Sequence, residues 1–202
     1  KDGEAVSATL KNVPSFVFAR GLDLYLPSID KTVKFDICFG GSFFAILKAE
    51  DFGFDIIPSE AAAITKMGLE VMEEANKQHK VQHPLIPENN KVLLAEFGIH
   101  KKGENARNCV IFGAKNVDRS PCGTGTCAKM ALLAAKGELK PGEKFLHESI
   151  LGTVFEGHYE PGLKVGDFDA VQPYIKGAAN ITGFNWLVQQ DSDSLLPGFL
   201  LG

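Results

Sequence analysis

The sequence predicts an α+β fold in which a mostly antiparallel or mixed sheet wraps around one buried helix. Short segments of alternating apolar and polar residues recur between turn residues over the first fifty positions. Residues 59–78 repeat apolar side chains at helical spacing, whereas residues 122–135 are apolar on nearly every side. A helix that is apolar all round has to be buried. We therefore expect the second helix to lie inside the sheet and the first to lie outside it.

Five strands are expected in the first part of the chain, where apolar and polar residues alternate between turns. They are residues 5–10, 16–19, 22–26, 33–38 and 43–47. Ser59 is then expected to cap a helix that runs to about Gln78, because Ile64, Met67 and Val71 recur at helical spacing above a polar face.

Loops and strands alternate around the second helix. Residues 82–90, which hold two prolines and two asparagines, predict a loop before the next strand, and Gly137 predicts the end of the buried helix. The expected strands are residues 92–97, 108–112, 144–150, 153–156, 170–175 and 180–189, with charged or Pro-Gly turns at 101–107 and 140–142.

The composition favours a small-molecule ligand. The chain has 202 residues, of which 45% are hydrophobic and 23% charged, and its formal net charge is −4. Lysines and glutamates are interleaved, so we expect neither a nucleic-acid nor an anionic-membrane partner. The longest apolar run, residues 37–47, is interrupted by Gly40, Gly41 and Ser42, and it is shorter than the roughly 20 residues of a spanning helix.

The cysteines predict free thiols. Cys38, Cys109, Cys122 and Cys127 form no CxxC pair and follow no regular spacing. This pattern favours reduced thiols in the cytoplasm, and it predicts neither a disulfide framework nor a metal site.

The stretch that enters the second helix carries the most chemical information. Pro121 restricts the backbone just before the helix, and Gly123 and Gly125 leave the first amide groups open to a ligand. A carboxylate could bind these amides and the positive end of the helix dipole. The same field is expected to lower the pKa of Cys122. A thiolate base beside a bound carboxylate suggests abstraction of the proton α to that carboxylate.

The pattern alone also allows a plainer interpretation. Glycine-rich turns often only cap a core helix, and the two cysteines could be small buried hydrophobic residues. A dinucleotide-binding loop of the form GxGxxA fits less well, because residues 118–121 separate the preceding strand from the glycine turn.

The segment DRSPCGTGTCAKMA, residues 118–131, resembles the signature of the proline racemase family. That family includes proline racemases, 4-hydroxyproline 2-epimerases and 3-hydroxyproline dehydratases. The resemblance covers nearly the whole chain and continues at residues 34–36, 39–45, 82–84, 110–113, 148–153 and 181–185.

The resemblance implies cofactor-independent transfer of a proton by two cysteines on opposite faces of the substrate α-carbon. It also implies a fold similar to diaminopimelate epimerase, with two pseudo-symmetric halves that each wrap a sheet around a central helix. Cys122 would be one of the two acid/base groups, and Gly123 and Thr124 would donate amides to the substrate carboxylate. Asp118 would face the substrate amine, and Phe112 would form an apolar wall against the ring.

One family motif is missing. The resemblance implies a second cysteine in a Met-Cys-Gly-His type motif, which does not occur here. Cys127 cannot replace it, because five residues along a helix move a side chain by about 7.5 Å and roughly 140°. We therefore expect a carboxy-terminal catalytic half over residues 1–178, and a returning segment over 179–202 that packs on an amino-terminal half of the same enzyme.

Within the family, the dehydratases carry threonine where this chain has Cys122, so a racemase or 2-epimerase is predicted. Proline is the predicted substrate, and 4-hydroxyproline is the alternative. A non-catalytic half that only binds a carboxylate is a further alternative, and a homodimer is left open. Because it would supply only one of the two cysteines, the chain by itself is expected to be inactive.

Overall fold

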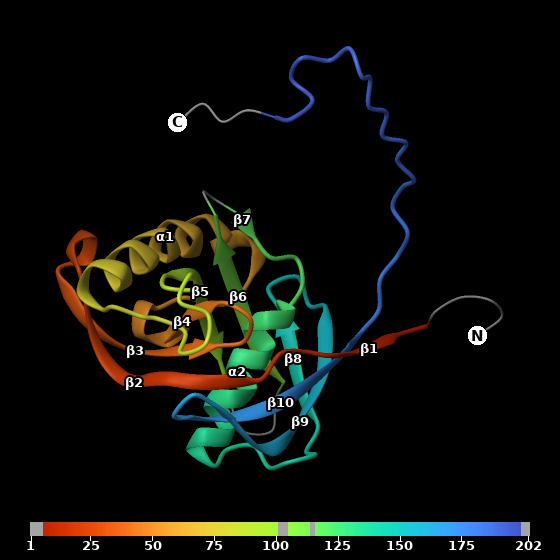
Figure 1. The fold of residues 1–202 in the computed structure, drawn as a ribbon. Coiled ribbons are helices and arrows are strands. Elements are labelled where there is room, and N and C mark those ends of the chain that lie inside the picture. The colour runs from red at the N-terminus through yellow and green to blue at the C-terminus, as the bar shows by residue number, and fades with distance from the viewer. Residues whose placement is uncertain (1–5, 101–104, 114–115, 199–202) are drawn as a thin grey trace.

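The computed structural model describes residues 6–100, 105–113 and 116–198 as ten strands and two α-helices, with three short 3-10 helices (Figure 1). In chain order they are β1 (Ala8–Lys11), β2 (Ser15–Leu26), η1 (Pro27–Ile29), β3 (Lys31–Phe39), β4 (Phe43–Lys48), η2 (Ala49–Phe52), η3 (Pro58–Glu60), α1 (Ala61–Gln78), β5 (Val92–Ile99), β6 (Ala106–Phe112), β7 (Asn116–Val117), α2 (Gly123–Lys136), β8 (Phe145–Ser149), β9 (Val154–Val165) and β10 (Phe168–Gly177).

The strands form a closed mixed sheet. Pairing runs in the order β10, β2, β3, β4, β5, β6, β8 and β9, and β9 pairs with β10 to close the ring, while β1 and β7 add to its outside. The pairs β4–β5 and β6–β8 are parallel. Parallel neighbours need a crossover connection. Helix α1 lies in the first crossover and α2 in the second, so the predicted α+β class and mixed sheet are confirmed.

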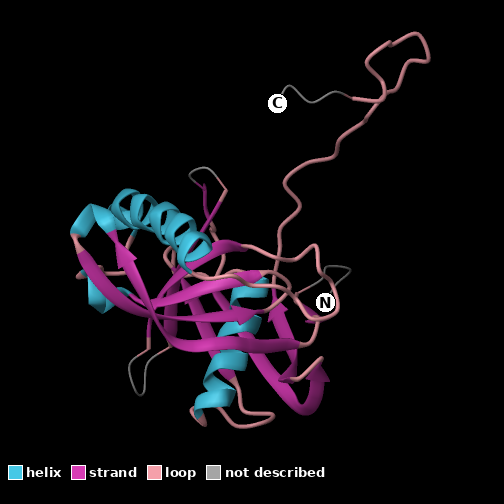
Figure 2. Ribbon diagram, turned by 60° about the vertical axis from the view of Figure 1, so that its left-hand side comes forward, coloured by secondary structure: helices cyan, strands magenta, loops and turns pink. Residues whose placement is uncertain are grey.

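The two helices differ in how they are buried. Helix α1 buries one face, as its helical spacing predicted. Helix α2 contacts β2, β3, β4, β9 and β10, and eight of its fourteen residues are buried. Figure 2 shows α1 along the outside of the sheet and α2 among the strands.

Strands between the helices are buried on both faces. On β4, Phe43 and Leu47 belong to the core cluster that contains the buried face of α1. Phe44 and Ile46 point to the other side and cluster with Leu132 of α2. Because successive side chains of a strand alternate between faces, burial on both sides produces the continuous apolar run that the sequence shows here.

Several predicted boundaries are wrong. The strands expected at 16–19 and 22–26 are the single strand β2, whose register shifts where Gly21 adopts a φ of +64°. The structure extends the strand expected at 153–156 to Val165 and starts β6 at Ala106, inside the expected turn. Part of that turn, residues 101–104, lies outside the described residues, as does Ala5 of the first expected strand.

The start of α1 also differs from the expectation. Residues 58–60 form a 3-10 turn, and the α-helix begins at Ala61 without a side-chain cap from Ser59. Proline at the first position of that turn accounts for the earlier bend. The predicted end of α2 is confirmed, because Gly137 follows it in the left-handed conformation with a φ of +72°.

The strand predicted at residues 180–189 is wrong. This segment has no strand pairing and leaves the body of the molecule as an extended chain (Figure 1). Its apolar side chains have no packing partner within the described residues, and Trp186 is 92% exposed. A strand requires a neighbour for its backbone hydrogen bonds, and none is present beside this segment. Within the described part of the chain, no helix is long and apolar enough to cross a membrane.

The loop between β3 and β4 lies directly against the backbone of α2. A Cβ atom at Gly40 would be 2.1 Å from the carbonyl oxygen of Thr124 and 2.6 Å from the amide nitrogen of Ala128. Such distances leave no space for a side chain. Gly40 therefore sets how closely the first two turns of α2 approach the sheet.

We predict that Gly40→Ala destabilises the protein by about 2 kcal/mol or more, because the added methyl group would meet backbone rather than a flexible side chain. Thermal denaturation would measure the change. Gly123→Ala is the matched control, because a Cβ there meets no atom within 4 Å. Equal melting temperatures for the two variants would contradict the close approach.

Candidate functional site

Cys122 occupies a strained position at the start of α2. Its φ is +63° and its ψ is 119°, and Asp30 is the other non-glycine residue with positive φ in the described chain. Such a conformation costs on the order of 1–3 kcal/mol and is concentrated at functional sites. The sequence pattern placed Cys122 at the helix start, but it carried no signal of this strain.

The Cys122 thiol caps the helix. Its sulfur accepts a hydrogen bond from the amide of Gly125 at 3.4 Å and lies 3.5 Å from the hydroxyl of Thr124. The side chain is 6% exposed, against 1% or less for Cys38, Cys109 and Cys127. All four thiols are free. Cys122 is thus the least buried of the four cysteines, and it lies at a helix N-terminus.

Burial raises the pKa of Cys122 to about 11. The hydrogen bonds from Thr124 and Gly125 act in the opposite direction, and the carboxylates of Asp118 and Glu96 add to the increase in pKa. The net direction is the reverse of the lowering expected from the helix N-terminus, because loss of hydration outweighs the two hydrogen bonds.

Burial raises the pKa of the other three thiols further, to about 12 for Cys109 and Cys127. Cys122 therefore remains the most easily ionised of the four. Cys38 and Cys109 lie within β3 and β6 as buried core residues.

The first amides of α2 are open to a ligand. The backbone amides of Gly123 and Thr124 donate no hydrogen bond to any acceptor among the described residues. A Cβ at Gly123 would meet nothing within 4 Å, so the approach to these amides is open. Two free amides at a helix N-terminus can bind an anionic group such as a carboxylate.

Asp118 is tied to Cys122 through Ser120. Its Oδ1 atom accepts hydrogen bonds from the Ser120 amide and hydroxyl, both at 2.9 Å, and the Ser120 oxygen accepts the amide of Cys122 at 3.1 Å. Asp118 Oδ2 has no hydrogen-bond partner in the described structure. One oxygen thus shapes the loop, and the other is available to a cationic group. The role of Ser120 was missed at the level of sequence.

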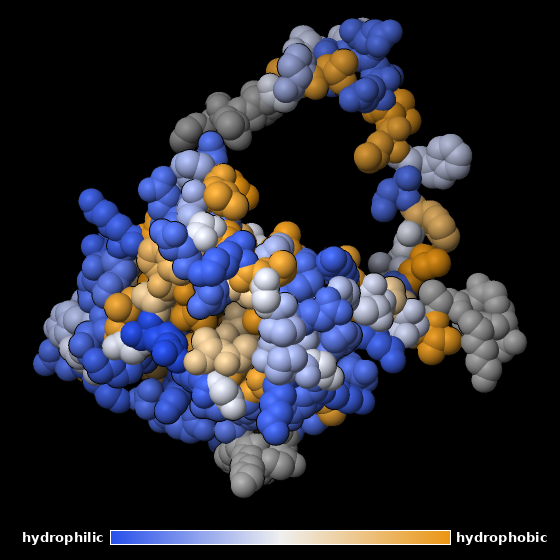
Figure 3. All heavy atoms as spheres, turned by 60° about the horizontal axis from the view of Figure 1, so that its bottom comes forward, coloured by the Kyte–Doolittle hydropathy of each residue, from blue (hydrophilic) through white to orange (hydrophobic). Residues whose placement is uncertain are grey.

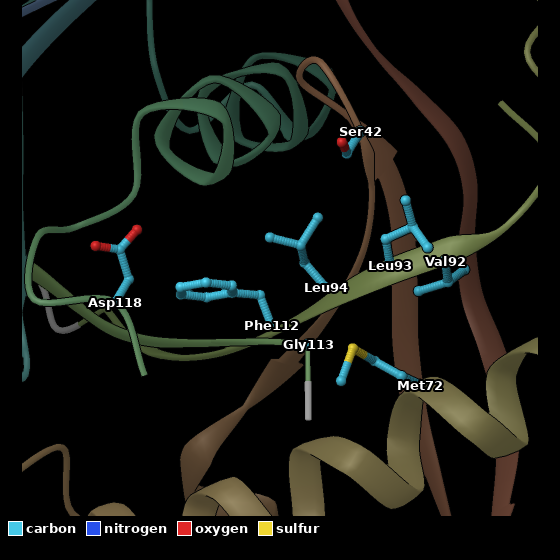
Figure 4. A pocket seen from close by; sticks show the side chains of 8 residues that line it. All are labelled: Ser42, Met72, Val92, Leu93, Leu94, Phe112, Gly113 and Asp118. Carbon is cyan, nitrogen blue, oxygen red and sulfur yellow. The ribbon is translucent and has the colours of Figure 1, made fainter. Parts of the chain in front are cut away.

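Asp118 and Phe112 line one pocket of about 570 Å³ (Figure 4). Its remaining lining residues are Ser42, Met72, Val92, Leu93, Leu94 and Gly113. Phe112, the last residue of β6, is 38% exposed, and its ring faces this space. Cys122, Gly123 and Thr124 do not line the pocket; they follow Asp118 where the chain enters α2.

Buried polar side chains hold the residue before the cysteine. The Pro121 carbonyl accepts hydrogen bonds from the Asn108 amide at 2.9 Å and the Thr126 hydroxyl at 3.3 Å. Thr126 in turn lies 3.0 Å from Nδ1 of His147. These residues come from β6, α2 and β8, so their spacing in the sequence gave no sign of the cluster.

A cluster of metal ligands is not part of this site. In residues 6–100, 105–113 and 116–198, no group of three or more His, Cys, Asp or Glu side chains is placed to hold a metal ion.

Comparisons with known proteins identify relatives over the whole chain. The family model described as proline racemase matches residues 1–200. Proline racemase of Clostridioides difficile is 48% identical over 202 residues, and the match covers 99% of this chain and 60% of the relative. A 4-hydroxyproline epimerase of Brucella ovis is 39% identical over 203 residues, which cover 98% of this chain and 60% of that protein. The chain thus spans about 60% of the length of these curated relatives.

Two solved structures share the fold. One is a probable proline racemase from Agrobacterium radiobacter with bound carbonate, at 31% identity and a TM-score of 0.89, matched over 100% of this chain and 59% of that one. The other is a hydroxyproline epimerase from Agrobacterium vitis with bound trans-4-hydroxy-L-proline. It has 34% identity and a TM-score of 0.89, and the match covers 100% of this chain and 58% of that one.

We predict that alkylation at limiting reagent labels Cys122 before the other three thiols. The physical reason is its greater exposure together with its lower pKa. Peptide mass spectrometry after brief treatment with iodoacetamide would identify the labelled cysteine. Earlier labelling of Cys38, Cys109 or Cys127 would refute the assignment.

Proposed function

This chain belongs to the proline racemase family, and we propose that it supplies one half of the active site of a cofactor-independent proline racemase. The observation that carries the proposal is the meeting of three features at the start of α2. They are the thiol of Cys122, which is buried but more exposed than the other three, the amides of Gly123 and Thr124, and Oδ2 of Asp118. Within the described residues, neither these amides nor this oxygen has a hydrogen-bond partner.

In the proposed reaction, two cysteines lie on opposite faces of the substrate α-carbon. One thiolate removes the α-proton, and the other thiol donates a proton to the opposite face, so the configuration inverts and each cysteine exchanges its role. Cys122 is one of the pair, and the second belongs to a part of the enzyme beyond this chain. Burial of Cys122 makes its thiolate the stronger base, which suits a proton as weakly acidic as this one.

Removal of the α-proton moves negative charge onto the substrate carboxylate. The amides of Gly123 and Thr124, together with the dipole of α2, would bind that carboxylate and stabilise the added charge. The Oδ2 atom of Asp118 would pair with the substrate amine. Phe112 would contact the pyrrolidine ring from the end of β6.

Proline is the proposed substrate, and 4-hydroxyproline is the second candidate. Most side chains that line the pocket beside Phe112 are apolar, such as Leu94 and Met72, and offer no partner to a ring hydroxyl, although Ser42 and Asp118 also line it. The higher identity to proline racemase, 48% against 39% for the 4-hydroxyproline epimerase, favours the same substrate. Initial rates on L-proline and trans-4-hydroxy-L-proline, measured with the intact enzyme, would separate the two.

Residues 1–178 are proposed to form one half of the enzyme, with α2 as its central helix, and residues 179–202 to return onto the other half. Hydrophobic side chains along the projecting segment support this, because they lie exposed in Figure 3. They include Ile181, Phe184, Trp186 and Leu187. So many large apolar side chains exposed along one segment favour an interaction site. The four free thiols support a location in the reducing cytoplasm.

We predict that Cys122→Ser in the intact enzyme lowers the rate of racemisation by at least about a hundredfold, since a hydroxyl is a far weaker acid and base for this transfer. Polarimetry on L-proline would measure it. Cys109→Ser is the control, because that thiol is buried in the core cluster that contains the inner face of α1, whereas Cys122 belongs to another cluster. Undiminished turnover by the Cys122 variant would overturn the proposed mechanism.

We further predict that residues 1–202 alone do not racemise proline, since one cysteine can exchange the α-hydrogen but cannot invert the centre. Water would also reach the amides and weaken their contacts with the carboxylate. Exposed apolar surface should make the chain self-associate. Polarimetry combined with light scattering would test both outcomes. Enzyme-like racemisation by the purified chain would mean that a second acid/base group lies within it.

A further inference from the structure

A buried carboxyl group lies against the first turn of α2. Glu96, on β5, is fully buried, and neither of its oxygens has a hydrogen-bond partner in the described structure. A Cβ atom at Gly125 would lie 3.1 Å from Glu96 Oε2 and 3.2 Å from Cys122 Cβ. The carboxyl group and the cysteine thus both border the space that a side chain at this glycine would fill, together with the ring of Phe44.

Glu96 belongs to a cluster of polar groups with unsatisfied hydrogen bonds. The buried side-chain atoms without a partner in the described residues are the two oxygens of Glu96, Oδ1 of Asn108 and Nε2 of His147. These residues lie on β5, β6 and β8, which are consecutive in the sheet. Asn108 also donates to Pro121, the residue before Cys122. Unsatisfied polar groups are rare in protein interiors, so their gathering beneath one cysteine calls for a functional account.

The charge of Glu96 is not held by an ion pair. Lys129, one turn beyond Gly125 on α2, is the cation that acts on it, but the two form no salt bridge. The other titratable groups around Glu96 and Cys122 are Cys38 on β3, Cys127 on α2, His147 on β8 and Asp118 before α2.

Burial raises the pKa of Glu96 to about 7, although the charge of Lys129 opposes the increase. Burial lowers the pKa of His147 well below its usual value, so that ring stays neutral. Burial also keeps the thiols of Cys38 and Cys127 protonated in this range. Glu96 is therefore the group beneath Cys122 that gains or loses charge near neutral pH.

We propose that Glu96 is a positioning residue for Cys122: its carboxyl group lies across Gly125 from the thiol and opposes thiolate formation whenever it is charged. This inference rests on the proposed role of Cys122. When Glu96 holds a proton, the thiolate forms without a neighbouring negative charge. When the pair carries one negative charge, that charge lies either on Glu96 or on Cys122, so deprotonation of one is coupled to protonation of the other.

The test compares alkylation of Cys122 by iodoacetamide in the intact protein and in its Glu96→Gln variant, between about pH 5.5 and 9.5, by quantitative peptide mass spectrometry. Glutamine keeps the shape and removes the charge. We expect equal rates below about pH 6, where Glu96 is already neutral. Above about pH 8 the variant should react faster, by about tenfold for each unit by which the thiol pKa falls.

Glu148→Gln is the matched control, because this partly buried glutamate pairs with Arg107 on β6 rather than facing Cys122. Its profile should match that of the unaltered protein. A Glu96→Gln variant that reacts faster at every pH would show only a more open site, and an unchanged profile would show no coupling. Either result would overturn the proposal.

The unaltered protein provides a second measurement that needs no variant. Coupling predicts two rises in the Cys122 alkylation rate with pH, separated by a flattening just above the titration of Glu96. A single rise refutes the proposal even if Glu96→Gln does not fold. Alkylation requires no turnover, so this result is independent of whether Cys122→Ser abolishes racemisation. The two proposals can therefore fail separately.

Discussion

The sheet holds α2 so closely that one of its neighbours, Gly40, has no space for a side chain. A Cβ at Gly40 would meet the backbone of the first two turns of α2, at Thr124 and Ala128. A contact with backbone cannot be relieved by a change of side-chain conformation, so it fixes how closely the start of the helix approaches the sheet. The position of every group at its N-terminus follows from this packing.

The site combines strain with close support. Cys122 adopts a conformation of positive φ that a β-carbon disfavours, and it is held by hydrogen bonds to Ser120 before the helix and to Gly125 in the first turn. Asn108 and Thr126 bind the carbonyl of the preceding Pro121. Such support allows the thiol and the free amides to keep one arrangement before a ligand binds. In an enzyme, this means that little reorganisation remains when charge develops.

The electrostatics at this position are a balance of opposed effects. The amide of Gly125 and the hydroxyl of Thr124 favour the thiolate of Cys122, while burial and two nearby carboxylates disfavour it. Burial has the larger effect, so the thiol is protonated at neutral pH in this chain. At a high pKa only a small fraction of the thiol is ionised, but the thiolate that forms is a strong base. The protonated thiol is the form that returns a proton to the substrate. The same environment therefore suits both directions of the proposed transfer.

Local sequence was sufficient for much of the fold. It determined the α+β class and the location of both helices, because an apolar stripe and an all-apolar segment have few alternative places in a folded chain. The signature around Cys122 determined the family and the candidate site, since the proline, glycines and cysteine that form it are contiguous. The end of α2 at Gly137 could also be predicted, because a helix often ends at a glycine in the left-handed conformation and this depends on that residue alone.

Tertiary structure alone decided the rest. Residues 180–189 have the composition of a strand but no neighbour to pair with, and pairing is not encoded in a single segment. The pKa of Cys122 depends on burial by residues far away in the chain, so the helix N-terminus by itself predicted the wrong direction. Glu96, Asn108 and His147 meet beneath α2 only because β5, β6 and β8 are neighbours in the closed sheet. Contacts between distant segments leave no periodic pattern in the sequence, so they could not be predicted from it. The sequence therefore determined which residues form the helix start, and the fold determined which residues surround it.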